Sequence, residues 1–261
     1  MAPQYTDVLY ELRGDAAWVT INRPKLMNAL RGQTLAELGT AMRRADGERV
    51  ACVVLTGAGE RAFCAGGDVA EMRDLDPARG RGFLKTFVDT VQVIRGLSKP
   101  VLCRVDGYCI GGGNELNVAC DLTIASDRSS FGQVGPTVGS VPVIGATQTL
   151  PRIVGEKRAR EIVFLCQRYP AEEALRLGLV NRVVPAAELD RAVDEWVARP
   201  GAMSPQALRI AKVSLNHAGD ALLPSLTAGI EMLAATYGGE ELREGMTAFL
   251  EKRAPDFKRF R

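Results

Sequence analysis

The sequence has very little histidine and no paired-cysteine motif. His217 is its single histidine, and none of the six cysteines forms a C-x-x-C pair or has a histidine at ligand spacing. One imidazole cannot assemble a histidine-rich metal site or a Ser–His catalytic pair. We therefore expect no metal centre, and we interpret the cysteines as reduced, buried packing residues.

The chain also has no large excess of one charge sign and no long apolar run. The 33 Lys and Arg residues nearly balance the 31 Asp and Glu residues, and the basic ones are spread along the chain, which argues against nucleic acid as the main partner. No stretch approaches the roughly 18 apolar residues of a membrane span, and residues 1–14 lack the pattern of a secretion signal. We therefore expect a cytoplasmic protein without a membrane or nucleic-acid partner.

Apolar runs of strand length alternate with amphipathic segments of helix length in the first half of the chain. Gly14 separates the first two runs, as in a hairpin. This alternation is typical of an α/β fold with a largely buried sheet flanked by helices. The expected strands cover 8–12, 16–21, 52–56, 101–105 and 122–125, and the expected helices cover 34–44 and 112–119.

The pattern becomes helical after residue 125. The Arg-Pro-Gly-Ala stretch at 199–202 is typical of a hinge, so we predict a core of residues 1–200 and a helical region of residues 201–261. The apolar faces of the later helices are extensive, which predicts self-association. These helices are expected over 157–166, 171–177, 187–197, 205–216, 222–237 and 242–252.

Two glycine-bearing turns follow predicted strands, and each leads into a helix. They are AFCAGGD at 62–68 and GYCIGGGNEL at 107–116. Glycine lets a backbone approach a ligand closely, and N–H groups at a helix N-terminus carry partial positive charge. Two such turns can converge on one developing oxyanion. Tight turns that need positive φ are the structural alternative.

Glu115 stands three residues after Gly112, in the first turn of the expected helix. A carboxylate there favours the helix dipole and can reach a group held at that terminus, although a purely structural first-turn acid is the alternative. The triple glycine is not a dinucleotide fingerprint, because the third glycine of that motif is missing. Cys64 has no histidine or clear cationic neighbour, so we interpret it as a packing residue. The remaining hypothesis is catalysis by a carboxylate without a metal ion.

Six motifs, in order, resemble the crotonase (enoyl-CoA hydratase/isomerase) superfamily. Besides the two glycine turns, they are INRPKLMNA at 21–29, CDLTIA at 120–125, FGQ at 131–133 and AFLEKR at 248–253. The resemblance implies an α/β fold built as a spiral of ββα units, with a helical C-terminal region that forms homotrimers, often paired into hexamers. It also implies an acyl-CoA thioester as substrate, with no cofactor beyond the coenzyme A that the substrate carries.

The resemblance also implies roles for individual residues. Gly67 and Gly112 match the two amide donors to the thioester oxygen, and Glu115 matches the first catalytic glutamate of the hydratases. Phe249 and Lys252 match positions that reach CoA bound to a neighbouring subunit. The implied substrate- and CoA-binding residues are Arg23, Lys25, Leu26, Arg61, Ala65, Gly111, Gly135, Phe249 and Lys252.

The second glutamate of the hydratases is missing, because Gly135 stands in its place. The segments 131–140 and 243–257 resemble the branch that contains dihydroxynaphthoyl-CoA synthase and the 6-oxocyclohex-1-ene-1-carbonyl-CoA hydrolases. Glu115 and Pro142 depart from the synthases, which argues against cyclisation and favours the hydrolases. Tyr237 matches an active-site tyrosine of the synthases, with a packing role at a helix end as the alternative.

The implied activity is the hydration of an enoyl-CoA, the hydrolysis of a C–C bond in a cyclic oxo-acyl-CoA, or both. An isomerase that uses Glu115 alone to move a proton and a synthase-like cyclase are the alternatives within the family. An RNA-binding or scaffold role is the alternative outside it. The near-neutral charge and the two glycine turns argue against that role.

Overall fold

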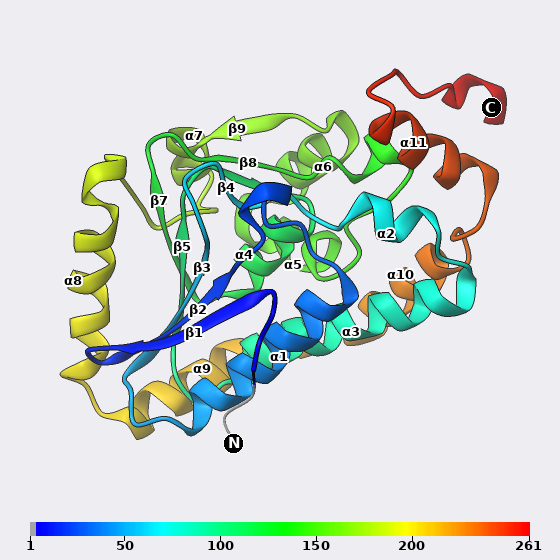
Figure 1. The fold of residues 1–261 in the computed structure, drawn as a ribbon. Coiled ribbons are helices and arrows are strands. Elements are labelled where there is room, and N and C mark those ends of the chain that lie inside the picture. Colours follow the sequence, from blue (N-terminus) through cyan, green and yellow to red (C-terminus); the bar gives the residue numbers. More distant parts are fainter. Residues whose placement is uncertain (1–3) are drawn as a thin grey trace.

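The structure, a computed structural model, describes residues 4–261 and is built around a six-stranded sheet of order β1-β2-β3-β5-β7-β10 (Figure 1). β1 and β2 form an antiparallel hairpin about Gly14, and the other neighbours are parallel. The five strands expected from the sequence are confirmed to within one residue at each end. The strands are β1 (Val8–Arg13), β2 (Ala16–Ile21), β3 (Cys52–Gly57), β5 (Val101–Val105), β7 (Leu122–Ser126) and β10 (Arg182–Val184).

The inner strands β2, β3 and β5 of this sheet are buried on both faces, whereas the edge strand β1 is largely exposed. The buried side chains alternate between two cores. Val53 and Leu55 of β3 contribute to the larger core with α1 (Gly32–Gly47) and α3 (Pro77–Gly96). Val54 faces the opposite way, into a smaller core with α8 (Leu189–Gly201). Successive side chains of a β-strand point to opposite faces of the sheet. Because both faces of β3 pack in a core, β3 is mostly apolar, as expected for a buried strand.

A second sheet consists of four strands, in the order β4-β6-β8-β9. Each has only three residues, too few to show a periodic pattern, so none of the four is predicted from the sequence. A strand of the first sheet, a strand of the second and a helical segment follow one another repeatedly, which confirms the expected ββα units of the crotonase-type α/β fold. The short strands are β4 (Ala62–Cys64), β6 (Tyr108–Ile110), β8 (Ser130–Gly132) and β9 (Arg168–Pro170).

Helix α3 was not expected from the sequence, because it contains three glycines, which are poor helix formers. Asp76 caps it by accepting a hydrogen bond from the N–H of Arg79, and its apolar face packs beside α1. Helix α5 was missed as well. The remaining helices are α2 (Val69–Arg73), α4 (Gly112–Ala119), α5 (Ala146–Val154), α6 (Glu156–Leu165), α7 (Ala171–Arg176), α9 (Pro205–Asp220), α10 (Leu223–Ala234) and α11 (Glu240–Leu250).

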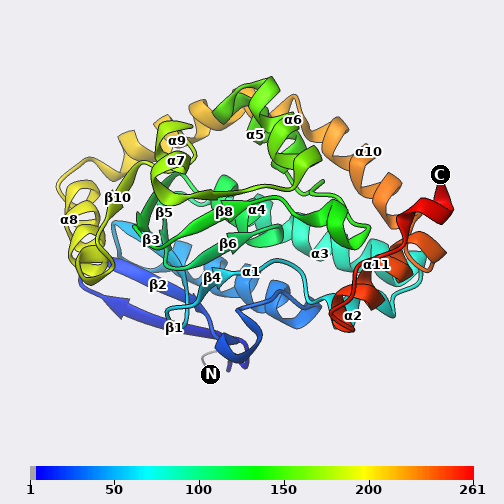
Figure 2. The same ribbon diagram turned by 90° about the horizontal axis from the view of Figure 1, so that it is seen from above.

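The C-terminal helices lie against the core, as Figure 2 shows from above. Lys212 of α9 is buried, and its Nζ is 2.7 Å from Asp121 Oδ2. Helix α11 packs on α2. Of the expected hinge at 199–202, Arg199, Pro200 and Gly201 form the last turn of α8, and α9 begins at Pro205. The boundary between a core of residues 1–200 and a helical region of residues 201–261 stays a prediction. Within residues 4–261, no helix combines the length and the apolar character that a bilayer crossing requires.

Candidate active site

The two glycine turns follow neighbouring strands of the short sheet and therefore lie together. β4 and β6 pair in parallel, with Cys64 opposite Cys109, so both chains leave the sheet at the same edge. The residues after β4 also pair with the chain that precedes α1, where the N–H of Leu30 donates to the oxygen of Gly66 at 2.8 Å. Tertiary pairing thus joins segments that are more than 30 residues apart in the sequence.

Glycine is required here because the two turns touch. A Cβ atom on Gly66 would lie 3.4 Å from the nitrogen of Gly112, and one on Gly113 would lie 2.2 Å from the carbonyl oxygen of Cys64. Gly66 and Gly111 also have positive φ, at 104° and 55°, a conformation that side chains disfavour. Larger residues at these positions would force the turns apart.

The amides of Gly67 and Gly112 have no acceptor in the part of the chain that the structure describes. The neighbouring N–H groups of Ala65, Asp68 and Gly111 are all hydrogen-bonded to backbone oxygens. Gly112 is also the first residue of α4, so its N–H carries the partial positive charge of a helix N-terminus. Both glycines line one cavity. Two donors in this arrangement can stabilise an oxyanion bound there.

Glu115 lies one helical turn below this N-terminus and is buried. The N–H of Ile144 donates to its Oε1 at 2.6 Å. Burial raises the pKa of Glu115 to about 8, although the N–H groups of Ile144 and Ala146 act in the opposite direction. A carboxyl group with a pKa near neutrality can both accept and donate a proton at physiological pH.

The cavity that Glu115 shares with Gly67 and Gly112 has a volume of about 120 Å³. Helix α3 supplies an apolar wall with Phe83, Leu84 and Phe87, and Leu233 of α10 adds to it. Among the described residues that line the cavity, Glu115 is the only ionisable one. A larger hollow of about 680 Å³, near Lys99, contains none of the residues predicted for the site. The smaller cavity therefore has the chemical groups that catalysis needs.

Gly135, which stands where the hydratases have their second glutamate, lies in a tight turn. Gly135 begins the 3₁₀ turn η2 (Gly135–Val138), and its carbonyl accepts a hydrogen bond from the N–H of Ser140 at 3.0 Å. A Cβ atom on Gly135 would lie 3.0 Å from the carbonyl oxygen of Ser140. Gln133, two residues earlier, lines the cavity and was not singled out from the sequence, where its only signal was its place in the FGQ motif.

The residues expected to bind CoA divide into exposed and inward-facing groups. Lys25 and Leu26 lie exposed on the 3₁₀ turn η1 (Pro24–Leu26), and Arg61 is exposed at the start of β4. Ala65, with Gly111, lines the cavity. Their contacts with CoA stay predictions.

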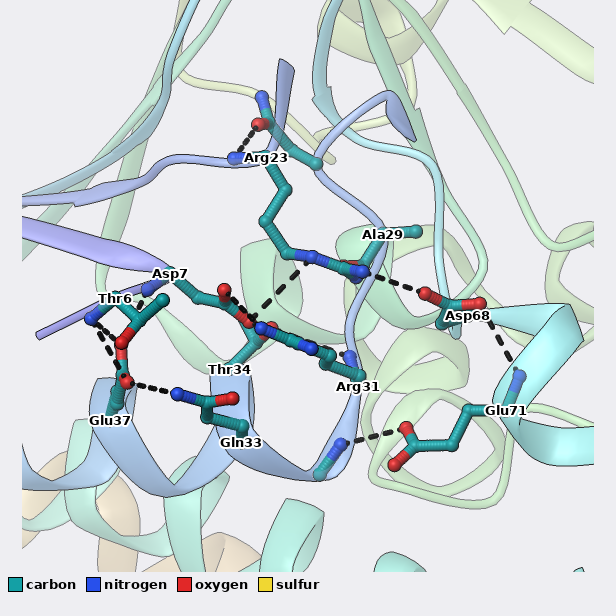
Figure 3. A network of polar contacts seen from close by, with 12 residues as sticks. Thr6, Asp7, Arg23, Ala29, Arg31, Gln33, Thr34, Glu37, Asp68 and Glu71 are labelled. Atoms are coloured by element: carbon teal, nitrogen blue, oxygen red, sulfur yellow. Dashed lines mark hydrogen bonds and ion pairs between the residues drawn. The ribbon is translucent and has the colours of Figure 1, made fainter. Parts of the chain in front are cut away.

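Arg23 points inward, into the polar network drawn in Figure 3. Its guanidinium is 2.9 Å from Asp68 Oδ2, and only 11% of the side chain is exposed. Asp68 directly follows Gly67 and caps α2 by accepting from two backbone N–H groups. Arg31 makes two further hydrogen bonds to Asp7, which hold the pKa of that carboxyl below its usual range. The network ties the chain before α1 to the Gly67 turn.

The C-terminal residues predicted for the site lie in different surroundings. Phe249 of α11 lines the cavity of its own chain, although it was expected to reach CoA bound to a neighbour. Lys252 is exposed just after α11. Tyr237 is not among the cavity-lining residues. Its ring packs against Gly80, and its buried hydroxyl has no hydrogen-bond partner in the described chain. A catalytic role for Tyr237 stays a prediction.

Comparison with known proteins supports the same family. Residues 12–260 match the model of the enoyl-CoA hydratase/isomerase family. An enoyl-CoA hydratase from Mycobacterium avium subsp. paratuberculosis is 30% identical, with a TM-score of 0.88 over 97% of this chain and 99% of that one. An enoyl-CoA hydratase/isomerase from Xanthobacter autotrophicus is 32% identical (TM-score 0.87, 99% and 100% coverage). An enoyl-CoA hydratase from Bacillus anthracis is 31% identical, with a TM-score of 0.78 over 97% of this chain and 99% of that one. This chain therefore belongs to the enoyl-CoA hydratase/isomerase family of acyl-CoA enzymes.

Proposed function

We propose that this chain adds water to the β-carbon of an enoyl-CoA, or to the ring ketone of a cyclic oxo-acyl-CoA, through a thioester enolate. One observation carries the proposal: the unpaired amides of Gly67 and Gly112 and the buried carboxyl of Glu115 line a single cavity. An enolate needs hydrogen-bond donors at its oxygen and an acid–base group near its carbon chain. This cavity supplies both.

In hydration, the thioester oxygen binds to the N–H groups of Gly67 and Gly112. Glu115 removes a proton from water as the water oxygen bonds to the β-carbon, and the electrons of the double bond move onto the thioester oxygen. The proton then passes from Glu115 to the α-carbon, which restores the carboxylate. In ring hydrolysis, Glu115 removes a proton from water as the water oxygen bonds to the ketone carbon. The C–C bond then breaks to give a carboxylic acid and a thioester enolate, and Glu115 returns the proton to the α-carbon.

A second candidate is enoyl-CoA isomerisation. The observation that favours it is that Glu115 is the sole ionisable residue among the described residues of the cavity wall. One carboxyl group suffices to move a proton between two carbons of a dienolate. Isomerisation takes no oxygen from water, so the two candidates differ in their products.

The test is mass spectrometry of products formed in oxygen-18 water from linear enoyl-CoA and cyclic oxo-acyl-CoA. Hydration predicts one labelled water per linear product, and ring hydrolysis predicts a labelled ring-opened acid. A shifted double bond without label would assign isomerisation instead. Glu115→Gln should lower any of these rates by about 10²-fold or more, and full activity in this variant would contradict the role given to Glu115.

A second variant tests the oxyanion donors directly. Gly112→Pro removes one N–H at the first position of α4, where proline fits the helix. Loss of a single donor typically lowers kcat by about 10²–10³-fold. Gly112→Ala is the matched control, because it keeps the N–H while its Cβ meets the same neighbours, Phe87 and Leu30, at 3.0 and 3.3 Å. Equal activity of the two variants would remove the Gly112 amide from the mechanism.

We also propose that the chain assembles as a homotrimer or a hexamer. Support comes from α9, where Ile210, Val213 and Leu215 are 58%, 61% and 79% exposed, because large apolar side chains gathered on one helix are typical of an interface. Light scattering of the wild type and Val213→Asp tests this. A monomeric wild type would contradict the proposal.

A further inference from the structure

Gln133 is a buried amide beside the two oxyanion donors. It follows β8, whose last residue, Gly132, accepts a hydrogen bond from the N–H of Gly111 at 2.9 Å. Gln133 is 0% exposed and lines the same cavity as Glu115 and Gly112. The sheet therefore fixes Gln133 against the turn that carries one oxyanion donor.

The carboxamide of Gln133 has no partner within the described chain. Neither Oε1 nor Nε2 makes a hydrogen bond, and both atoms are buried. A buried polar group without a partner destabilises the fold, and native proteins rarely keep one without a reason. Gln148, the other buried glutamine, contrasts with it, since Thr147 donates to its Oε1 at 3.0 Å. A molecule bound in the cavity that Gln133 lines can supply the missing partner.

The rest of the wall offers few polar alternatives. Most of the lining is glycine or apolar, and Glu115, Gln133 and Ser140 supply the polar side chains of its described part. Position 135 contributes none, because it is glycine, and a Cβ there would lie 3.0 Å from the carbonyl oxygen of Ser140. Gln133 offers one acceptor and two donors in a single group. Those are the contacts that a water molecule needs.

We propose that the Gln133 carboxamide holds the water molecule that attacks the substrate, an inference that rests on the proposed hydration. Oε1 accepts one water hydrogen, and Glu115 accepts the other and removes it as the C–O bond forms. Gln133 neither gains nor loses a proton, so Glu115 makes both proton transfers. Gln133 thus orients the nucleophile, as a second carboxylate would do if position 135 carried one.

The test compares two reactions of the same enolate site. Hydration of crotonyl-CoA needs the bound water, whereas exchange of the α-hydrogens of butyryl-CoA in deuterium oxide needs only Glu115 and the amides. Gln133→Met keeps the size of the side chain and removes its hydrogen bonds. We expect kcat for hydration to fall about 100-fold, with α-exchange within about 3-fold of the wild type. We also expect the thermal midpoint to rise by about 3 °C, because the unpaired amide is gone.

Gln148→Met is the matched control, since it removes another buried carboxamide, one that lies outside this cavity but borders a second, smaller pocket with Glu115. Any effect that Gln148→Met has through Glu115 should act on both reactions alike. The control should therefore leave the ratio of hydration to exchange unchanged. A parallel loss of both reactions in Gln133→Met would indicate a packing role and overturn the inference, as would unchanged hydration. A wild type that exchanges α-hydrogens but hydrates no enoyl-CoA would instead overturn the proposed hydration, and with it this inference.

Discussion

Replacing Glu115 with glutamine should make the folded protein more stable, by an amount that grows as the pH rises. The side chain is buried and its pKa is raised from 4.5 to about 8 by burial. Between these values the unfolded chain has an ionised carboxylate while the folded chain keeps the proton. The stability of the wild type therefore falls with rising pH across this interval. Glutamine is neutral throughout and keeps an oxygen that can accept from the N–H of Ile144.

The size of the stabilisation follows from the difference between the two pKa values of Glu115, 4.5 in the unfolded chain and about 8 in the folded one. At about 1.4 kcal/mol per pH unit, the cost of ionising Glu115 reaches roughly 5 kcal/mol once the pH exceeds 8. Below pH 4.5 it vanishes, because the carboxyl is protonated in both states. All other groups titrate alike in the two proteins, so they cancel in the difference between the variant and the wild type. The difference in the free energy of unfolding therefore reports the ionisation of Glu115 alone.

Urea unfolding at pH 5, 6, 7, 8 and 9, at one protein concentration and one ionic strength, measures the difference in the free energy of unfolding. Glu60→Gln is the control, because the Glu60 side chain is 77% exposed, and its difference should be small at every pH. A Glu115→Gln difference that stays flat from pH 5 to 9 would refute the reasoning, because it would mean that the carboxylate is as well solvated in the folded protein as in the unfolded chain.

Three further predictions concern the same site. If Glu115 is the base, kcat/KM for hydration should rise with pH to a plateau above about pH 8, and a rate that falls over this range would make it the acid. Gly113→Ala should lower the free energy of unfolding by about 3 kcal/mol or more, because its Cβ would meet a β4 carbonyl at 2.2 Å, whereas Gly47→Ala in open space should change it by less than about 1 kcal/mol. Arg23→Met should lower the free energy of urea unfolding by about 2 kcal/mol, since it removes the ion pair with Asp68 and leaves that partly buried carboxylate with only its two backbone N–H donors. A loss below 1 kcal/mol would contradict this.

The candidate site shows where prediction from sequence ends. The two glycine turns and Glu115 were identified because local chain chemistry marks them: strand, glycine, then helix start. Gln133 was missed because its importance lies in burial without a partner, which depends on groups far away in the chain. Arg23 was predicted to be one of the CoA-binding residues, which stays a prediction, and the sequence did not show that its side chain pairs with Asp68, 45 residues later. Side-chain direction depends on tertiary partners, which no local pattern encodes.

Apolar periodicity and short motifs were enough to predict the strands of the long sheet, most of the helices and the family. The four short strands could not be predicted in this way, because three residues show no periodic pattern and these segments become strands only by pairing with one another. The same pairing brings the Gly67 and Gly112 amides to one cavity and removes Glu115 from water. The reactive groups are local in sequence, but their burial, and with it their chemistry, arises from contacts between distant segments.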